Sequence, residues 1–137
     1  MIVVDSSAVV AMMLAEPSAT VVAARLAADT ERVMSIASYL ETGTVLAGRR
    51  RNDRLKAIDE LDAFLSETGI DLVPVDVSQG RVALSARITH GRGMGHGGAL
   101  NFGDAFSYAL AKTRDAPLLF VGNDFAGTDI KAALTLQ

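Results

Sequence analysis

Four carboxylates stand where an α/β chain would bring them together. Each one follows an expected strand or lies in the first turn of an expected helix; they are Asp5, Glu41, Asp104 and Asp124. Because the carboxyl ends of parallel strands meet at one edge of a sheet, we expect these side chains to converge there. The opening run, MIVVDSS, shows the pattern most plainly, since three apolar β-branched residues end on Asp5.

Grouped carboxylates repel one another and raise one another's pKa unless cations neutralise them. The chain has no cysteine and only two histidines, so an all-oxygen site favours Mg²⁺ or Mn²⁺ over zinc. Such ions polarise phosphoryl oxygens and activate water, which makes phosphodiester hydrolysis the leading reaction class.

A purely structural role for the same acids stays open at this stage. Helix starts favour negative charge by a few tenths to about 1 kcal/mol, so each acid is tolerated locally. Glu41 follows Ser38 by three residues, which is the spacing of a capping box, and Asn101 is the expected N-cap of the helix that carries Asp104.

The acids depend on an alternation of strands and helices for their positions. Apolar runs predict strands over residues 2–4, 33–36 and 118–121, and an apolar–polar alternation predicts another over 70–77, where Pro74 favours a sheet edge or an irregularity. Helical periodicity covers residues 7–14 (capped by Ser6 or Ser7), 18–28, 37–51, 53–66, 78–89 and 100–113, and a short terminal element spans 129–136. The alternation predicts an α/β fold whose mainly parallel sheet is flanked by helices.

Length and composition predict one domain over residues 1–137. Half of the residues are hydrophobic, and the absence of cysteine excludes a disulfide framework. We see no signal peptide or membrane span and expect a cytoplasmic protein without a membrane partner.

Two segments allow two interpretations each. The net charge of −3 does not favour nucleic acid, yet residues 49–56 hold five basic side chains, which form a solvated helix end or a phosphate-facing patch. The glycine-rich stretch 91–98, GRGMGHGG, is a mobile or RNA-contacting loop or a loose surface connection.

Four stretches, spread over nearly the whole chain, resemble PIN-domain ribonucleases, and specifically VapC-type toxins of bacterial toxin–antitoxin pairs. They are IVVDSSAVVAM at 2–12, SIASYLETGTVL at 35–46, LNFGDAFSYALAK at 100–112 and LLFVGNDFAGTDI at 118–130. The third is the most specific. The resemblance implies a PIN-like three-layer fold and RNA cleavage. It also implies a homodimer and a VapB-type antitoxin whose C-terminal segment covers the active site.

The resemblance also implies roles for individual residues. Asp5, Glu41, Asp104 and Asp124 match the family's acidic quartet, which holds Mg²⁺ or Mn²⁺. Our hypothesis is that Asp5 and Asp104 ligate the main ion, whereas the other two acids bind it through water or hold a second ion. Ser7 matches the hydroxyl residue that supports the first aspartate, and Asp129 is an additional acid of lower weight.

Two other functions compete with this reading. A phosphatase of the haloacid-dehalogenase type also has an aspartate after its first strand, but it needs a second one two residues later, where this chain has Ser7. A catalytically inert RNA- or protein-binding module would use the acids only as helix caps.

Overall fold

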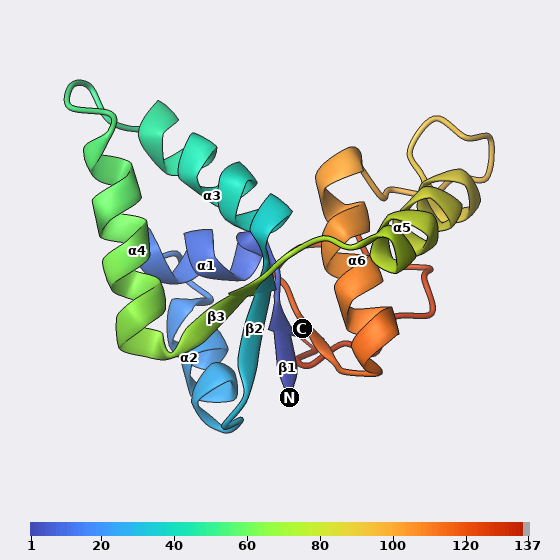
Figure 1. Cartoon of the computed structure of the whole chain (residues 1–137), viewed down its shortest axis with the longest axis horizontal. Helices are drawn as coiled ribbons and strands as arrows, with labels where there is room; N and C mark the ends of the chain where they lie inside the picture. Colours follow the sequence, from blue (N-terminus) through green and yellow to red (C-terminus); the bar gives the residue numbers. More distant parts are fainter. Residues whose placement is uncertain (136–137) are drawn as a thin grey trace.

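A sheet of four parallel strands forms the centre of the computed structural model, which describes residues 1–135 (Figure 1). The strand order is β3-β2-β1-β4, and every neighbouring pair runs parallel. The strands are β1 (Ile2–Val4), β2 (Arg32–Ser35), β3 (Ile70–Val73) and β4 (Leu118–Leu119). The predicted parallel α/β sheet is therefore confirmed.

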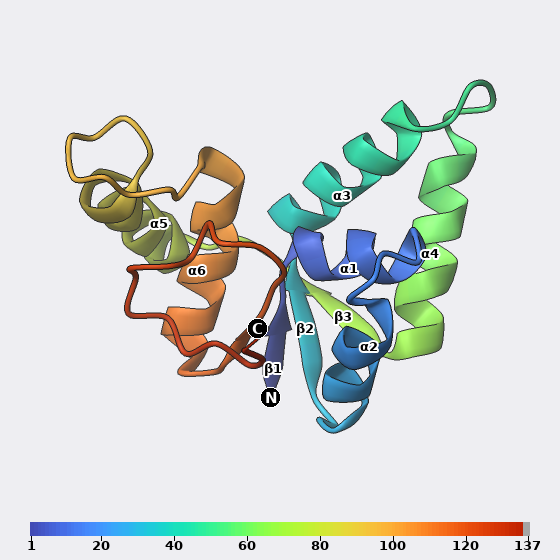
Figure 2. The same ribbon diagram turned by 180° about the vertical axis from the view of Figure 1, so that it is seen from behind.

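Helices cover both faces of this sheet. They are α1 (Ser6–Met13), α2 (Ala19–Ala27), α3 (Ile36–Gly48), α4 (Lys56–Thr68), α5 (Val77–His90) and α6 (Phe102–Arg114). The two opposite views show α5 and α6 on one side of the sheet and α1, α2 and α4 on the other (Figures 1 and 2). Helix α3 starts at the carboxyl end of β2 and leads away towards α4.

The two faces build two separate hydrophobic cores, because successive strand residues point to opposite sides. In β1, Ile2 and Val4 join the core with α1, α2 and α4, whereas Val3 joins the core with α5 and α6. Met34 and Val33 divide in the same way along β2. All three residues of β1 are fully buried, as expected for a strand without polar alternation.

Strand β3 lies at an edge of the sheet, as Pro74 predicted. The strand ends at Val73, shorter than the expected 70–77, and α5 begins at Val77 with Asp76 as its N-cap. Proline lacks the N–H that a longer ladder would need, which explains the early end.

Two predicted helix caps are wrong. The N-cap of α1 is Asp5 rather than Ser6 or Ser7, and its side chain accepts a hydrogen bond from the Ser7 backbone N–H. The N-cap of α3 is Ser35 rather than Ser38. Because α3 starts at Ile36, Glu41 is its sixth residue and lies beyond the first turn, which removes the capping-box explanation for this acid.

The end of the chain forms no helix or strand over residues 129–135. Ala132 instead makes a parallel bridge beside Leu118, whose backbone N–H donates to Lys131 O at 2.8 Å. The predicted terminal element is wrong over this range, and Leu136 lies outside the described residues. None of the helices within residues 1–135 is long and apolar enough to span a membrane.

Candidate active site

The carboxyl ends of the strands open into a cavity of about 310 Å³ whose walls carry five carboxylates. We call it the acid cavity. Its walls come from α1 and the turn after it, from α3, from the start of α6 and from the loop after β4; the lining residues are Asp5, Ser6, Ser7, Val10, Glu16, Glu41, Val45, Asn101, Asp104, Val121, Asp124 and Phe125. The four acids expected to converge therefore line one cavity, together with a fifth, Glu16.

Asp5 is held by hydrogen bonds on both carboxylate oxygens. Its Oδ2 accepts from the Ser7 hydroxyl at 2.6 Å and from the Ser7 backbone N–H at 3.0 Å. Its Oδ1 accepts from the Ser107 hydroxyl of α6 at 2.6 Å. Ser7 is itself fixed, because its hydroxyl accepts from the Val121 backbone N–H at 3.0 Å. Asp5 is only 2% exposed, so these donors replace the water that a charged carboxylate would otherwise require.

Asp104 caps α6 and faces the acid cavity at the same time. Asn101 Oδ1 accepts from the Asp104 backbone N–H at 2.8 Å, and Asp104 Oδ2 accepts from the Asn101 N–H at 3.0 Å, which completes a capping box. The N-cap predicted at Asn101 is thus confirmed. Burial raises the pKa of Asp104 to about 7, helped by the charges of Asp5 and Asp124 and opposed by the Asn101 hydrogen bond.

Glu41 reaches the acid cavity from the second turn of α3. The Ser6 hydroxyl, at the start of α1, donates to Glu41 Oε1. On its other side the carboxylate lies directly against Gly103, the second residue of α6. Glu41 therefore contacts the start of α1, which follows Asp5, and the start of α6, which carries Asp104.

Asp124 lies in the turn that follows β4, and its carboxylate is more accessible than those of Asp5 and Asp104. Arg92, from the glycine-rich loop, approaches Asp124 Oδ1 with its Nη2 atom at 3.9 Å. Both side chains are exposed, so this ion pair adds little stability. It does bring the glycine-rich loop to the rim of the acid cavity.

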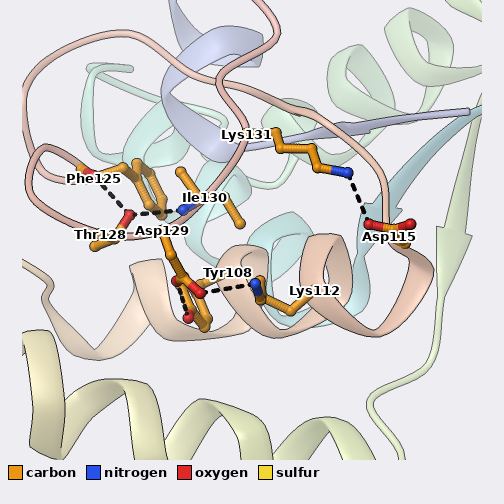
Figure 3. A network of polar contacts seen from close by, with 8 residues as sticks. All are labelled: Tyr108, Lys112, Asp115, Phe125, Thr128, Asp129, Ile130 and Lys131. Carbon is orange, nitrogen blue, oxygen red and sulfur yellow. Dashed lines mark hydrogen bonds and ion pairs between the residues drawn. The ribbon is translucent and has the colours of Figure 1, made fainter.

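Asp129 is not among the residues that line the acid cavity. Its side chain lies beside Tyr108 and Lys112 of α6 (Figure 3). Its carboxylate accepts from the Tyr108 hydroxyl at 2.5 Å and from Lys112 Nζ at 2.8 Å. These two donors, Lys112 first, lower its pKa to about 2. Asp129 therefore ties the C-terminal segment to the outer side of α6 and is not brought to the acid cavity.

The chemistry of the cavity wall suits a hard divalent cation. All five carboxylates offer oxygen ligands, and no lysine, arginine or histidine is among the described lining residues. Burial, followed by the negative charges of Asp5 and Asp124, raises the pKa of Asp104, and a bound cation would offset the repulsion between these acids. As the side chains stand, no three acidic or imidazole groups within residues 1–135 are close enough to enclose one ion.

Three contributors were missed in the sequence. Ser6 was considered only as a helix cap, and Glu16 was not considered as a site residue. Ser107 follows Asp104 by three residues, so the two share a face of α6; this spacing is the signal that could have revealed it.

Most of the chain matches a known protein family. The model of the PIN domain matches residues 2–131, so the chain belongs to the PIN-domain family.

Within that family its relatives are VapC ribonucleases. Ribonuclease VapC30 of Mycobacterium tuberculosis is 46% identical over 128 residues, which cover 93% of this chain and 95% of that protein. Ribonuclease VapC28 of the same organism is 44% identical over 132 residues, covering 96% of this chain and 97% of that protein. The resemblance to VapC-type ribonucleases is thus confirmed, and a phosphatase of the haloacid-dehalogenase type loses its support.

Solved structures agree on the fold. The sarcin–ricin-loop-cleaving toxin VapC20 of M. tuberculosis superposes with a TM-score of 0.74 at 19% identity, covering 95% of this chain and 96% of that chain. A toxin–antitoxin complex from Klebsiella pneumoniae gives 0.69 at 15% identity, covering 94% and 93%. The predicted PIN-like three-layer architecture is confirmed.

Proposed function

We propose that this chain is a metal-dependent endoribonuclease toxin that hydrolyses RNA phosphodiester bonds at the acid cavity. Membership of the PIN-domain family and identity of 41–46% to VapC ribonucleases support the reaction class. The observation that carries the assignment to this site is the gathering of Asp5, Glu41, Asp104 and Asp124 around one cavity. We treat residues 1–137 as one PIN domain that acts in the cytoplasm, where its RNA substrate is found.

We assign the metal to these four acids and take Mg²⁺ or Mn²⁺ as the ion, since both prefer oxygen ligands. When bound, such an ion would polarise the scissile phosphate and lower the pKa of a water molecule, so that the water would lose a proton to solvent and supply the attacking hydroxide. Asp5 and Asp104 are the inner ligands, because they are the most buried acids of the cavity and the charge of Asp5 acts on Asp104. Glu41 and Asp124 bind through water or hold a second ion.

Ser7 and Ser107 orient Asp5, and Asn101 orients Asp104. The Ser7 and Ser107 hydroxyls donate to separate oxygens of Asp5, which leaves the carboxylate little freedom to rotate. Asp129 is left out of the metal site, since its oxygens are occupied by Tyr108 and Lys112.

We propose that the chain forms a homodimer and is neutralised by a VapB-type antitoxin that covers the acid cavity. One solved relative of the same fold is described as a toxin–antitoxin complex. Beside the cavity, α3 and α6 each expose a large apolar side chain, Leu40 at 70% and Phe102 at 73%. A second protein chain that covered the acid cavity would also bury these two side chains, and burial of apolar surface favours association.

The competing function is an inert binding module, and one observation favours it: Asp104 does form a capping box. Calorimetric titration with Mn²⁺ separates the two functions. We expect wild-type protein to bind Mn²⁺ and the variants Asp5→Asn and Asp104→Asn to lose most of the affinity. Caps alone bind metal poorly, so a wild type without measurable binding would favour the inert module.

A further inference from the structure

Gly103 is the second residue of α6 and stands next to Asp104. A Cβ atom built on Gly103 would overlap Glu41 Oε2 and would lie 2.8 Å from Glu41 Cδ and 3.1 Å from Oε1. All three of the nearest atoms belong to the Glu41 side chain. A methyl group at this position would therefore displace Glu41 and no part of the backbone.

The backbone at position 103 does not itself require glycine. Gly103 is not among the residues with positive φ, and it continues as ordinary helix into α6. Glycine within a helix is less favourable than alanine by about 1 kcal/mol. What glycine supplies here is space for a carboxylate to approach the start of the helix.

Glu41 is confined from the opposite side as well. The Ser6 hydroxyl donates to Oε1, so the carboxylate lies between the first residue of α1 and the second residue of α6. The start of α1 follows Asp5 directly, and the start of α6 carries Asp104. Because Ser6 Oγ already contacts the carboxylate, Glu41 could not retreat from a Gly103 Cβ towards Ser6. The carboxylate would have to leave the space between the two helix starts, which would withdraw one acid from the cavity.

We propose that Gly103 is a positioning residue whose missing side chain admits Glu41 to the acid cavity. The consequence for metal binding rests on the proposed function, whereas the steric contact does not. Gly103→Ala removes no ligand and no hydrogen-bonding side chain, yet it should resemble a variant that lacks Glu41.

The test is a cycle of four proteins: wild type, Gly103→Ala, Glu41→Ala and the double variant. In the wild-type background we expect Gly103→Ala to weaken Mn²⁺ binding, measured by calorimetry, about 10- to 100-fold, as is common when a ligand loses its support. In the Glu41→Ala background there is no carboxylate to displace. There the same change should alter Mn²⁺ affinity by no more than about twofold, the usual scatter for independent sites.

Thermal unfolding in EDTA measures the contact without metal. We expect Gly103→Ala to raise the unfolding temperature in the Glu41→Ala background, because alanine favours a helix, and to raise it less or lower it when Glu41 is present. Gly80→Ala is the matched control: it lies inside α5 with open space around its Cβ, and it should behave alike in both backgrounds without changing Mn²⁺ affinity.

Equal losses of Mn²⁺ affinity in both backgrounds would overturn the proposal, because Gly103 would then act through α6 and not through Glu41. Unchanged affinity of Gly103→Ala alongside a wild type that binds Mn²⁺ would overturn it too. A wild type that binds no Mn²⁺ would contradict the proposed function instead; the unfolding cycle in EDTA would still accept or reject the steric contact.

Discussion

At the scale of single residues, Asp104 combines burial with negative neighbours. It is 5% exposed, and burial followed by the charges of Asp5 and Asp124 raises its pKa from 3.8 to about 7. Between these values the folded protein holds a proton that the unfolded chain has lost. The contribution of this group to stability is therefore lost as pH rises from about 4 to 7, by at most about 1.4 kcal/mol per pH unit.

The first prediction concerns this proton. In EDTA, wild type should lose stability relative to Asp104→Asn as pH rises from 5 to 7.5, since the asparagine stays neutral throughout. Urea unfolding at several pH values measures the difference between the two proteins, so titrating groups that do not interact with Asp104 cancel. Parallel curves for the two proteins would show that Asp104 titrates at its ordinary pKa.

The affinity for Mn²⁺ should depend on whether Asp104 carries this proton. The ion competes with it, so affinity should rise with pH up to about 7 and change less above that value. Calorimetry in two buffers of different ionisation enthalpy counts the protons released. Release near pH 6 in wild type and none from the Asp104→Asn site is the expected result.

Ser107 is a second residue that matters for the site, because its hydroxyl contacts both Asp5 and Ser38. Its hydroxyl is fully buried, donates to Asp5 Oδ1 and lies 3.0 Å from the Ser38 hydroxyl, which is 1% exposed. Since the single Ser107 proton goes to Asp5, Ser38 is the donor of this pair.

Ser107→Ala should leave Ser38 without its partner and Asp5 without one of three donors. We expect a loss of about 1–3 kcal/mol in the free energy of unfolding and of about 10- to 100-fold in Mn²⁺ affinity. Ser85→Ala, at an exposed position of α5, is the control for both measurements. Full retention of Mn²⁺ affinity in Ser107→Ala would show that Ser7 alone suffices to hold Asp5.

At the scale of elements, α5 and α6 are two of the helices with a side-chain N-cap, and removal of each cap can be compared. Asn101 caps α6 inside the acid cavity, and Asp76 caps α5 outside the described cavity wall with a 2.8 Å hydrogen bond from the Gln79 N–H. Replacing either residue with alanine should cost about 1 kcal/mol of stability. Only Asn101→Ala should also weaken Mn²⁺ binding. If Asp76→Ala weakened it as much, the effect would reflect stability rather than the position of Asp104.

Sequence patterns predicted those features of the elements that depend on neighbouring residues. Asn101 as N-cap, Pro74 at a sheet edge and the buried strand before Asp5 all follow from local chemistry. The cap of α3 was misplaced from Ser35 to Ser38, because both are serines that precede helical residues and only packing separates them. Ser38 turns inward to meet Ser107, 69 residues away, and no local pattern encodes such a contact.

The candidate site likewise combines features set by neighbouring residues with contacts between distant ones. Asp5, Asp104 and Asp124 could be selected from their places after strands and at a helix start. Glu41 was selected with them although the expected helix start was misplaced, since α3 begins at Ile36. Glu16 and the Glu41–Gly103 approach depend on how separate helices pack, and the pairing of Asp129 with Tyr108 and Lys112 depends on the path of the C-terminal segment.

At the scale of the whole molecule, the exposed apolar side chains beside the acid cavity bear on the proposed homodimer. We expect a solution mass twice that of the 14.4 kDa chain. Leu40→Glu should shift it towards the monomer, since a charge would be buried at the interface. Light scattering after size exclusion measures the mass. Leu84→Glu is the control, because Leu84 is 64% exposed on α5 and does not line the surface pocket that Leu40 helps to form. A monomeric wild type would contradict the homodimer.

The central claim is that the carboxylates of the acid cavity hydrolyse RNA with a divalent ion. The most direct measurement is cleavage of total RNA, with mapping of the new ends, by wild type and Asp5→Asn in Mn²⁺ and in EDTA. We predict discrete cuts by wild type in Mn²⁺, and loss of those cuts in EDTA and in the folded Asp5→Asn variant. The same cuts made by Asp5→Asn at the wild-type rate would contradict the account.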